Sequence, residues 1–305
     1  MRILVTDKAD AKALDRIRKA GHEVVEKLGV QGPDLVAALD GFHALLVRGA
    51  TKVTGDVLRA TTTLKVVVRA GTGLDNVDAA AAREKGIAVY NTPNANSISV
   101  AELVFGLLLA FERHLPDAVS ELRQGRWEKT RFAGHEIAGR RMGLVGFGRI
   151  GREVALRARA FQMEVWAYDP VIGHWPEDFA WVKQVELREL LVASDVVSLH
   201  VPLDAKTRGM IAADELSRMK LDSILVNCSR GGVVDEAALG EALQAKQLRG
   251  AILDVFATEP APADHPLLKL PNVLATPHLG ASTAEAQRRA GDDAAAILVE
   301  ALAKL

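Results

Sequence analysis

Cysteine is almost absent from the sequence, because Cys228 is the only one in 305 residues. A single cysteine excludes an intrachain disulfide framework and favours a reducing compartment, so we expect a cytoplasmic protein. An excess of either charge is also lacking. The formal net charge is −1, which gives no global field for nucleic acid or a membrane surface. The longest strongly apolar helical run, 103–111, is too short to span a bilayer, and no side-chain spacing typical of a metal site is found.

Short apolar stretches alternate with helical patterns along most of the chain, and its length favours two domains. Several helical patterns of the first half end at glycines, which suit helix C-termini. This alternation predicts an α/β fold class with parallel sheets covered by helices on both faces. The expected strands are 3–6, 23–27, 44–47, 64–69, 87–90, 142–145, 165–168, 196–201, 224–227, 251–254 and 273–275. The expected helices are 11–20, 33–39, 54–59, 77–85, 149–161, 187–193, 212–218, 235–245 and 283–305.

A long apolar helix is expected at 97–114, followed by a second helical segment at 115–124. Pro116 is expected to separate the two, because proline interrupts a helix. A helix this apolar must be covered over most of its surface. It is interpreted either as a core helix that links the domains or as a contact between two copies of the chain, and the sequence leaves both open.

The segment MGLVGFGRIG at 142–151 places a glycine-rich turn directly after an expected strand and before an expected helix. Gly146 suits a tight turn, Gly148 lets the backbone approach a pyrophosphate, and Gly151 lets helix and strand pack closely. The free N–H groups and the positive dipole end of the helix favour phosphate there. Glycine-rich turns also occur as purely structural features. The flanking strands and helix favour a dinucleotide site over that alternative.

An acidic residue follows the second strand of this segment. Asp169 lies eighteen residues after Gly151, close to the spacing of about twenty at which an acid binds the adenosine ribose. Its carboxylate would repel the 2′-phosphate of NADP, so the sequence predicts NAD as the cofactor. Arg149 could offset that repulsion, but its place inside the loop favours a contact with the pyrophosphate.

Three polar segments follow expected strands in the second half of the chain. They are NCSRGGVVDE at 227–236, DVFATEP at 254–260 and TPHLGAST at 276–283. Since ligands bind at the carboxyl ends of parallel strands, we expect Arg230, Glu259 and His278 to converge on one cleft. An arginine suits the carboxylate of a 2-keto acid, and a histidine suits proton transfer at its oxygen. A glutamate suits the orientation of that histidine, so the set predicts hydride transfer to or from a 2-hydroxy acid.

Each of these residues also has a purely structural interpretation. Arg230 could be a surface residue at a helix start, although a cation there opposes the helix dipole. Glu259, which precedes a proline, could be a turn residue, and His278 could be a loop histidine. Cys228 is interpreted as a small buried residue near the cofactor rather than a nucleophile, because no base stands beside it in the sequence.

The segments VRAGTGLDNVD at 68–78 and NTPNANS at 91–97 complete a set of motifs that extends over nearly the whole chain. With them, the sequence resembles the D-isomer-specific 2-hydroxyacid dehydrogenases. The resemblance implies a flavodoxin-like substrate-binding domain, 1–95 and 283–305, and a Rossmann NAD-binding domain, 96–282, both doubly wound, with a cleft between them. It also implies a homodimer that forms through the nucleotide domain and the long helix.

The resemblance assigns catalysis to Arg230, Glu259 and His278, with His278 as the proton donor to the keto acid. It also implies a set of residues in contact with NAD, in addition to the three glycines of the turn. These are Thr72, Arg149, Ile150, Asp169, Cys228, Arg230, Asp254, His278 and Gly280.

The RAGTG stretch at 69–73 points, within the family, to D-3-phosphoglycerate, whose oxidation to 3-phosphohydroxypyruvate begins serine biosynthesis. The phosphate is expected to be bound by Arg48, Arg69 and Arg131, although each alone could be a solvated surface residue.

The rival enzyme function is a hydroxypyruvate or glyoxylate reductase. From another class, the rival is a nicotinamide-sensing binding protein similar to the C-terminal binding protein corepressors. Since the chain ends at Leu305, we expect no serine-binding regulatory domain.

Overall fold

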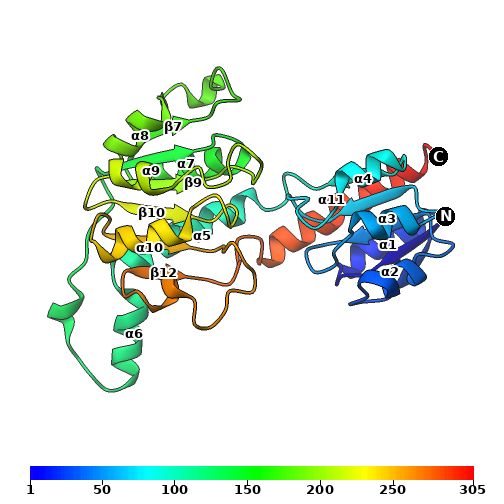
Figure 1. Ribbon diagram of the computed structural model, residues 1–305, viewed down its shortest axis with the longest axis horizontal. Helices are drawn as coiled ribbons and strands as arrows, with labels where there is room; N and C mark the ends of the chain where they lie inside the picture. The colour runs from blue at the N-terminus through cyan, green and yellow to red at the C-terminus, as the bar shows by residue number, and fades with distance from the viewer. The chain divides into compact units, whose positions relative to one another are not determined.

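The computed structural model describes residues 1–305, which divide into two compact units (Figure 1). One unit contains Met1–Asn96 and Ala281–Leu305, and the other contains Ser97–Gly280. The chain therefore leaves the first unit after Asn96 and returns to it at Ala281. None of the helices could serve as a transmembrane span.

The first unit is built on a parallel sheet of five strands in the order β2-β1-β3-β4-β5. This is the flavodoxin-like order 2-1-3-4-5. The central strands are continuous apolar runs, because helices cover both of their faces; β3, for example, reads ALLV and is buried throughout. The strands are β1 (Arg2–Val5), β2 (Glu23–Glu26), β3 (Ala44–Val47), β4 (Val66–Arg69) and β5 (Ala88–Asn91).

Helices of the first unit lie on both faces of this sheet. α1 (Ala11–Lys19) and α11 (Ala284–Leu302) share one apolar cluster with the sheet. The two helices pack closely, since a Cβ added at Gly291 would lie 3.1 Å from the Cβ of Asp10. The other face is covered by α2 (Gly32–Ala38), α3 (Gly55–Ala60) and α4 (Ala79–Glu84).

The second unit is built on a parallel sheet of seven strands in the order β12-β11-β10-β9-β6-β7-β8. Counted from β6, this is the Rossmann order 3-2-1-4-5-6 with one further strand, and its order reverses between β6 and β9. The expected fold class is confirmed in both units. The strands are β6 (Arg141–Val145), β7 (Glu164–Tyr168), β8 (Lys183–Gln184), β9 (Val196–Leu199), β10 (Ile224–Asn227), β11 (Gly250–Leu253) and β12 (Val273–Ala275).

Two apolar clusters cover the faces of this second sheet. α5 (Ser97–Glu112) and α7 (Arg149–Ala160) contribute to one cluster. The other cluster includes side chains from α8 (Leu187–Ala193), α9 (Ala213–Arg218) and α10 (Glu236–Gln244). The remaining elements are α6 (Leu115–Arg123) and three short 3₁₀ helices, η1 (Lys129–Phe132), η2 (Glu177–Phe179) and η3 (Pro266–Lys269).

The structure corrects the expectation in two places. The second sheet has a seventh strand, β8, which the apolar pattern could not indicate because it is only two residues long and both are exposed. The break between α5 and α6 lies at His114, whose φ is 51°, whereas Pro116 lies in the first turn of α6, where its missing N–H costs nothing. The long helix α5 is a core helix of its own unit, where Phe105 stacks on Phe161 at 5.2 Å.

Candidate active site

The three polar segments leave neighbouring strands at the carboxyl edge of the second sheet. β10 pairs with β11, and β11 pairs with β12, all in parallel. Arg230 follows β10, Glu259 follows β11 and His278 follows β12. The sheet thus delivers a guanidinium, a carboxylate and an imidazole to the same edge of one unit, as the order of the strands requires.

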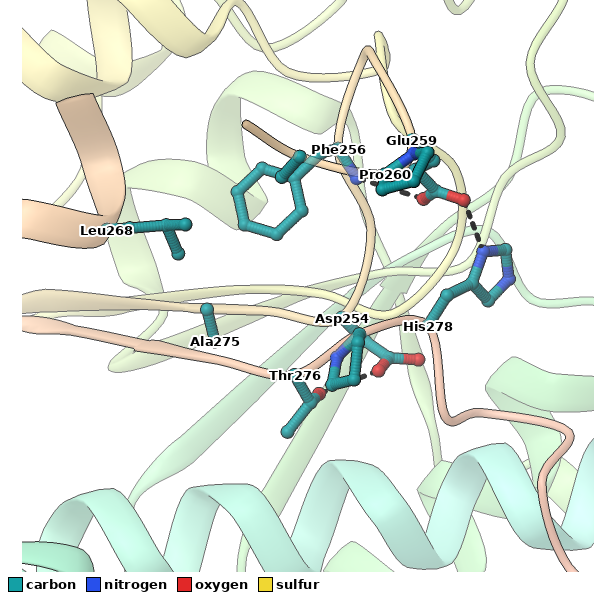
Figure 2. Close-up of a pocket in the computed structure, with 10 residues that line it drawn as sticks. Asp254, Phe256, Glu259, Pro260, Leu268, Ala275, Thr276 and His278 are labelled. Carbon is teal, nitrogen blue, oxygen red and sulfur yellow. Dashed lines mark hydrogen bonds and ion pairs between the residues drawn. The ribbon is translucent and has the colours of Figure 1, made fainter. Parts of the chain in front are cut away.

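The imidazole of His278 is directed toward the carboxylate of Glu259 (Figure 2). The Nδ1 atom of His278 lies 2.7 Å from Oε2 of Glu259, and both side chains are partly exposed, 48% and 37%. His278 has a φ of 54°, which is uncommon for a residue other than glycine. Backbone strain of this kind clusters at functional sites, where the surrounding structure must hold it. With Nδ1 paired to Glu259, Nε2 remains for a substrate.

The buried carboxylate of Asp254 holds the turn that carries His278. Its Oδ1 accepts hydrogen bonds from Oγ1 of Thr276 at 2.6 Å and from the N–H of Leu279 at 2.7 Å. Its Oδ2 accepts from the N–H of Gly280 at 2.8 Å, and the N–H of His278 donates to the Asp254 carbonyl at 2.8 Å. Asp254 therefore fixes the strained backbone of His278, and its expected contact with NAD stays a prediction.

Asn227 shapes the turn that carries Arg230. Its Oδ1 accepts from the N–H and the hydroxyl of Ser229, and its Nδ2 donates to the Arg230 carbonyl at 3.0 Å. The following glycine touches the loop of Glu259, since a Cβ added at Gly231 would lie 1.8 Å from the Phe256 carbonyl oxygen. Arg230 does not lie at a helix start, because α10 begins only at Glu236, so the dipole argument does not apply to it.

A cavity of about 470 Å³ lies beside the His278–Glu259 pair, within the second unit. Figure 2 shows its walls, which come from the segments after β11 and β12 and from Leu268 of η3. Its lining is mostly apolar, with His278, Glu259 and Asp254 as the charged or titratable members. A mostly apolar cavity with a few convergent polar groups is typical of a small-molecule site.

The glycine-rich turn after β6 has the shape that a pyrophosphate requires. A Cβ at Gly146 would lie 2.6 Å from the His200 carbonyl oxygen, and one at Gly151 would lie 2.3 Å from the Gly146 carbonyl oxygen. Gly148, in contrast, has nothing within 4 Å of an added Cβ, so the space beside it is open. It is the N-cap of α7 and provides no side-chain cap, which leaves the first N–H groups of Arg149, Ile150 and Gly151 for an anion.

Asp169, the expected ribose ligand, directly follows β7. Its Oδ2 accepts from the N–H of Phe147 at 2.8 Å, and its Oδ1 accepts from the N–H of Val171 at 2.9 Å. Oδ1 also accepts the N–H of Ile172 at 3.2 Å. Because a carboxylate has about four lone-pair directions, Asp169 can still accept one ribose hydroxyl group. The residues of this unit therefore fit NAD, whose pyrophosphate the turn would hold and whose ribose Asp169 would hold.

Cys228 is buried in the apolar cluster of α5 and α7. Burial raises the pKa of its thiol, and the charge of Asp254 raises it further. A neutral thiol is a poor nucleophile, so the structure agrees with a packing role for this residue.

His200, directly after β9, lies at this same edge, although no sequence pattern indicated a role for it. Its Nε2 lies 3.0 Å from the Ser198 hydroxyl, and its buried Nδ1 has no protein partner. Burial lowers its pKa to about 3 from the ordinary value of 6.5. The expected strand 196–201 extended past this residue, whereas β9 ends at Leu199, so the sequence did not place His200 at a strand end.

We expect His200 to lower the free energy of unfolding as the pH is lowered from 6.5 to about 3. In that window the unfolded chain binds a proton at this residue and the folded chain does not, so the free energy of unfolding decreases by about 1.4 kcal/mol per pH unit. His200→Gln should remove this contribution. Urea unfolding at pH 6.5 and 5 should show a loss about 2 kcal/mol smaller in the variant; equal losses would contradict the assignment.

In the first unit, Arg48 and Arg69 lie side by side at the carboxyl ends of β3 and β4. The Nε of Arg69 donates to the Arg48 carbonyl at 3.2 Å, and Asp7 accepts the Arg48 N–H at 2.6 Å. Thr72 follows on the same edge and donates its hydroxyl to Asn96 at 2.6 Å. The structure thus brings two of the three candidate phosphate ligands together.

Arg131, the third candidate phosphate ligand, belongs to the second unit. It lies in η1 with 61% of its side chain exposed and an ion pair to Glu121 of α6 at 3.4 Å. Nothing in its surroundings distinguishes it from a surface arginine, and its role stays a prediction.

The sequence of the second unit matches a known family. The model for the NAD-binding domain of the D-isomer specific 2-hydroxyacid dehydrogenases matches residues 105–280. The chain belongs to this family. The matched span lies within the second unit, which is therefore the NAD-binding domain of a family member.

Individual relatives agree with this. The chain is 47% identical to a D-3-phosphoglycerate dehydrogenase of Methanocaldococcus jannaschii, over 95% of this chain and 55% of the relative. It is 46% identical to a hydroxypyruvate reductase of Thermotoga maritima, over 95% of this chain and 94% of the relative. The TT0316 protein of Thermus thermophilus superposes with a TM-score of 0.91 at 38% identity, covering 100% and 97% of the two chains. The chain thus spans about half the length of the phosphoglycerate dehydrogenase relatives it matches.

Proposed function

We propose that the protein oxidises D-3-phosphoglycerate to 3-phosphohydroxypyruvate, with NAD as the oxidant. The observation that carries this proposal is the His278–Glu259 pair, held at 2.7 Å on a strained turn at the carboxyl edge of an NAD-binding sheet. The relatives named phosphoglycerate dehydrogenase, 43–47% identical, support the choice of substrate.

Three side chains have proposed roles in the oxidation. His278 removes the proton of the 2-hydroxyl group at Nε2, because its Nδ1 is engaged by Glu259. Glu259 stabilises the imidazolium that results. Arg230 binds the substrate carboxylate with its planar guanidinium. NAD, when bound, supplies the acceptor for the hydride that leaves C2.

Arg48 and Arg69 are proposed to bind the substrate phosphate. Replacing either by alanine should raise KM for D-3-phosphoglycerate, because each charge-assisted hydrogen bond to phosphate contributes about 1.5–3 kcal/mol. That corresponds to a rise of about 10- to 150-fold. Turnover of unphosphorylated hydroxypyruvate with NADH should change far less. Arg59→Ala, an exposed arginine of α3 in the same unit, is the control. Unchanged phosphoglycerate kinetics in both variants would remove the phosphate site.

A hydroxypyruvate or glyoxylate reductase is the second candidate, because the hydroxypyruvate reductase of Thermotoga maritima matches this chain over 94% of its own length. An assay of NADH absorbance with D-3-phosphoglycerate, hydroxypyruvate and glyoxylate separates the two by their kcat/KM values. We expect D-3-phosphoglycerate to have the highest kcat/KM. Activity with hydroxypyruvate and glyoxylate alone would favour the second candidate, and no activity with any 2-hydroxy or 2-keto acid would favour a corepressor-like binding protein.

We further propose that the protein works in the cytoplasm as a homodimer and that α6 contributes to its interface. No residue of α6 is buried, and Leu115, Val119 and Leu122 are 46–55% exposed at helical spacing along one face. Figure 1 shows α6 standing apart from the sheet of its unit. Light scattering should give twice the chain mass of 32.7 kDa, and Val119→Glu should lower it; a monomeric wild type would contradict the proposal.

A further inference from the structure

Two glutamates bind consecutive backbone N–H groups in the loop after β11. The N–H of Phe256 donates to Oε1 of Glu259 at 3.1 Å, and the N–H of Ala257 donates to Oε1 of Glu236 at 2.6 Å. Glu259 belongs to the same loop. Glu236, in contrast, is the first residue of α10, the helix that precedes β11 in the sequence. The backbone that presents Glu259 is therefore tied to α10 through one carboxylate.

The other oxygen of Glu236 is held by His265, the N-cap residue that directly precedes η3. Its Nε2 lies 3.1 Å from Oε2 of Glu236, and its Nδ1 accepts the N–H of Leu267 at 3.3 Å. Because Nδ1 is an acceptor, the proton of the neutral ring lies on Nε2 and is donated to Glu236. The two side chains are only 14% and 21% exposed, in contrast to the more open His278–Glu259 pair.

The rings and backbone around this pair leave the loop little freedom. The imidazole of His265 packs edge-on against the ring of Phe256, with centroids 5.1 Å apart. On the other side, the Phe256 carbonyl lies against Gly231, where a Cβ would come within 1.8 Å. Phe256 is thus fixed by His265, Gly231 and Glu259, and any shift of its peptide would move the carboxylate that faces His278.

We propose that Glu236 and His265 are positioning residues that hold Glu259, and through it the imidazole of His278, in the geometry for proton transfer. This inference rests on the proposed function. Neither residue lines the cavity beside His278, so both act through the peptide between Phe256 and Ala257.

The test compares Glu236→Ala with Glu241→Ala, a control that removes an exposed carboxylate from the same helix. Loss of the anchor should lower kcat about 10- to 100-fold, because small misplacements of reacting groups are costly. KM for NAD should change less than about twofold, since no nucleotide-binding residue is altered. The control should match the wild type in both. Glu236→Gln keeps an oxygen for the N–H of Ala257 but places an amide against His265. Its kcat should lie between those of Glu236→Ala and the wild type.

A double-mutant cycle tests whether Glu236 acts through Glu259. In a Glu259→Gln background, Glu236→Ala should lower kcat by less than about twofold further. A full 10- to 100-fold further loss would mean that Glu236 acts independently and would overturn the inference.

A measurement without substrate separates this inference from the proposed function. Proton NMR of the full chain should show a downfield imidazole N–H resonance from the Nδ1 of His278, identified by its loss in His278→Asn. That resonance should broaden or vanish in Glu236→Ala and persist in Glu241→Ala. Its persistence in Glu236→Ala would overturn the inference. If the wild type were inactive but the His278 resonance were still lost in Glu236→Ala and kept in Glu241→Ala, the proposed function would fail and the positioning role would stand.

Discussion

Replacing His278 by alanine is expected to lower kcat for D-3-phosphoglycerate about 10²–10⁴-fold, the usual contribution of a general acid–base group. The reason is the geometry: its Nδ1 is paired with Glu259 at 2.7 Å, and its Nε2 is the atom left for the substrate hydroxyl. The Kd of NAD, measured by titration, should change only a few-fold, because the residues proposed to hold its pyrophosphate and ribose, at the turn after β6 and at Asp169, are not altered.

His174→Ala is the control for this variant, because His174 is an exposed loop histidine of the same unit. It should keep the kinetics of the wild type. Near-normal turnover in His278→Ala would remove His278 from its role. A loss of turnover that merely followed a loss of NAD binding would argue for a cofactor contact in place of proton transfer.

Gly231→Ala is expected to cause a comparable loss of activity without removing any functional group. The new Cβ would lie 1.8 Å from the Phe256 carbonyl oxygen and 2.7 Å from the Ala257 nitrogen, both backbone atoms. The turn of Arg230 and the loop of Glu259 must then move apart. We expect kcat/KM to fall about 100-fold or more and the free energy of unfolding to fall by about 1–3 kcal/mol from overpacking.

Gly240→Ala is the matched control for this glycine, since the nearest atom to its added Cβ is a methyl group of Leu267 at 3.6 Å. It lies inside α10, where alanine is preferred over glycine by about 0.5–1 kcal/mol, so the control should be slightly more stable and equally active. Wild-type kinetics in Gly231→Ala would show that the two loops need not touch for activity.

Most of the fold was predictable because each local pattern agreed with it. Continuous apolar strands such as β3 alternate with helices that begin at capping residues such as Asp10, and this alternation indicates a parallel sheet. The errors have local causes. β8 is too short and too exposed to give a pattern, and the break before α6 depends on the left-handed backbone of His114, a residue type that does not require it.

The candidate site was predictable where position along a strand determines position in space. Arg230, Glu259 and His278 each follow a strand of one sheet, and adjacent strands bring their ends together. Glu236 and His265 were not found in this way, because their pairing depends on how η3 packs against α10 and not on strand order. His200 was missed because its consequence, a pKa lowered to about 3, comes from burial that no sequence pattern displays.

The most direct test of the central claim follows the hydrogen itself. The protein is incubated with NAD and D-3-phosphoglycerate that carries deuterium at C2, and the reduced nucleotide is analysed by mass spectrometry. We predict NADH that has gained the deuterium, formed with the D-isomer and not with the L-isomer. NADH without deuterium, or no reduction of NAD by the D-isomer, would contradict direct hydride transfer from this substrate.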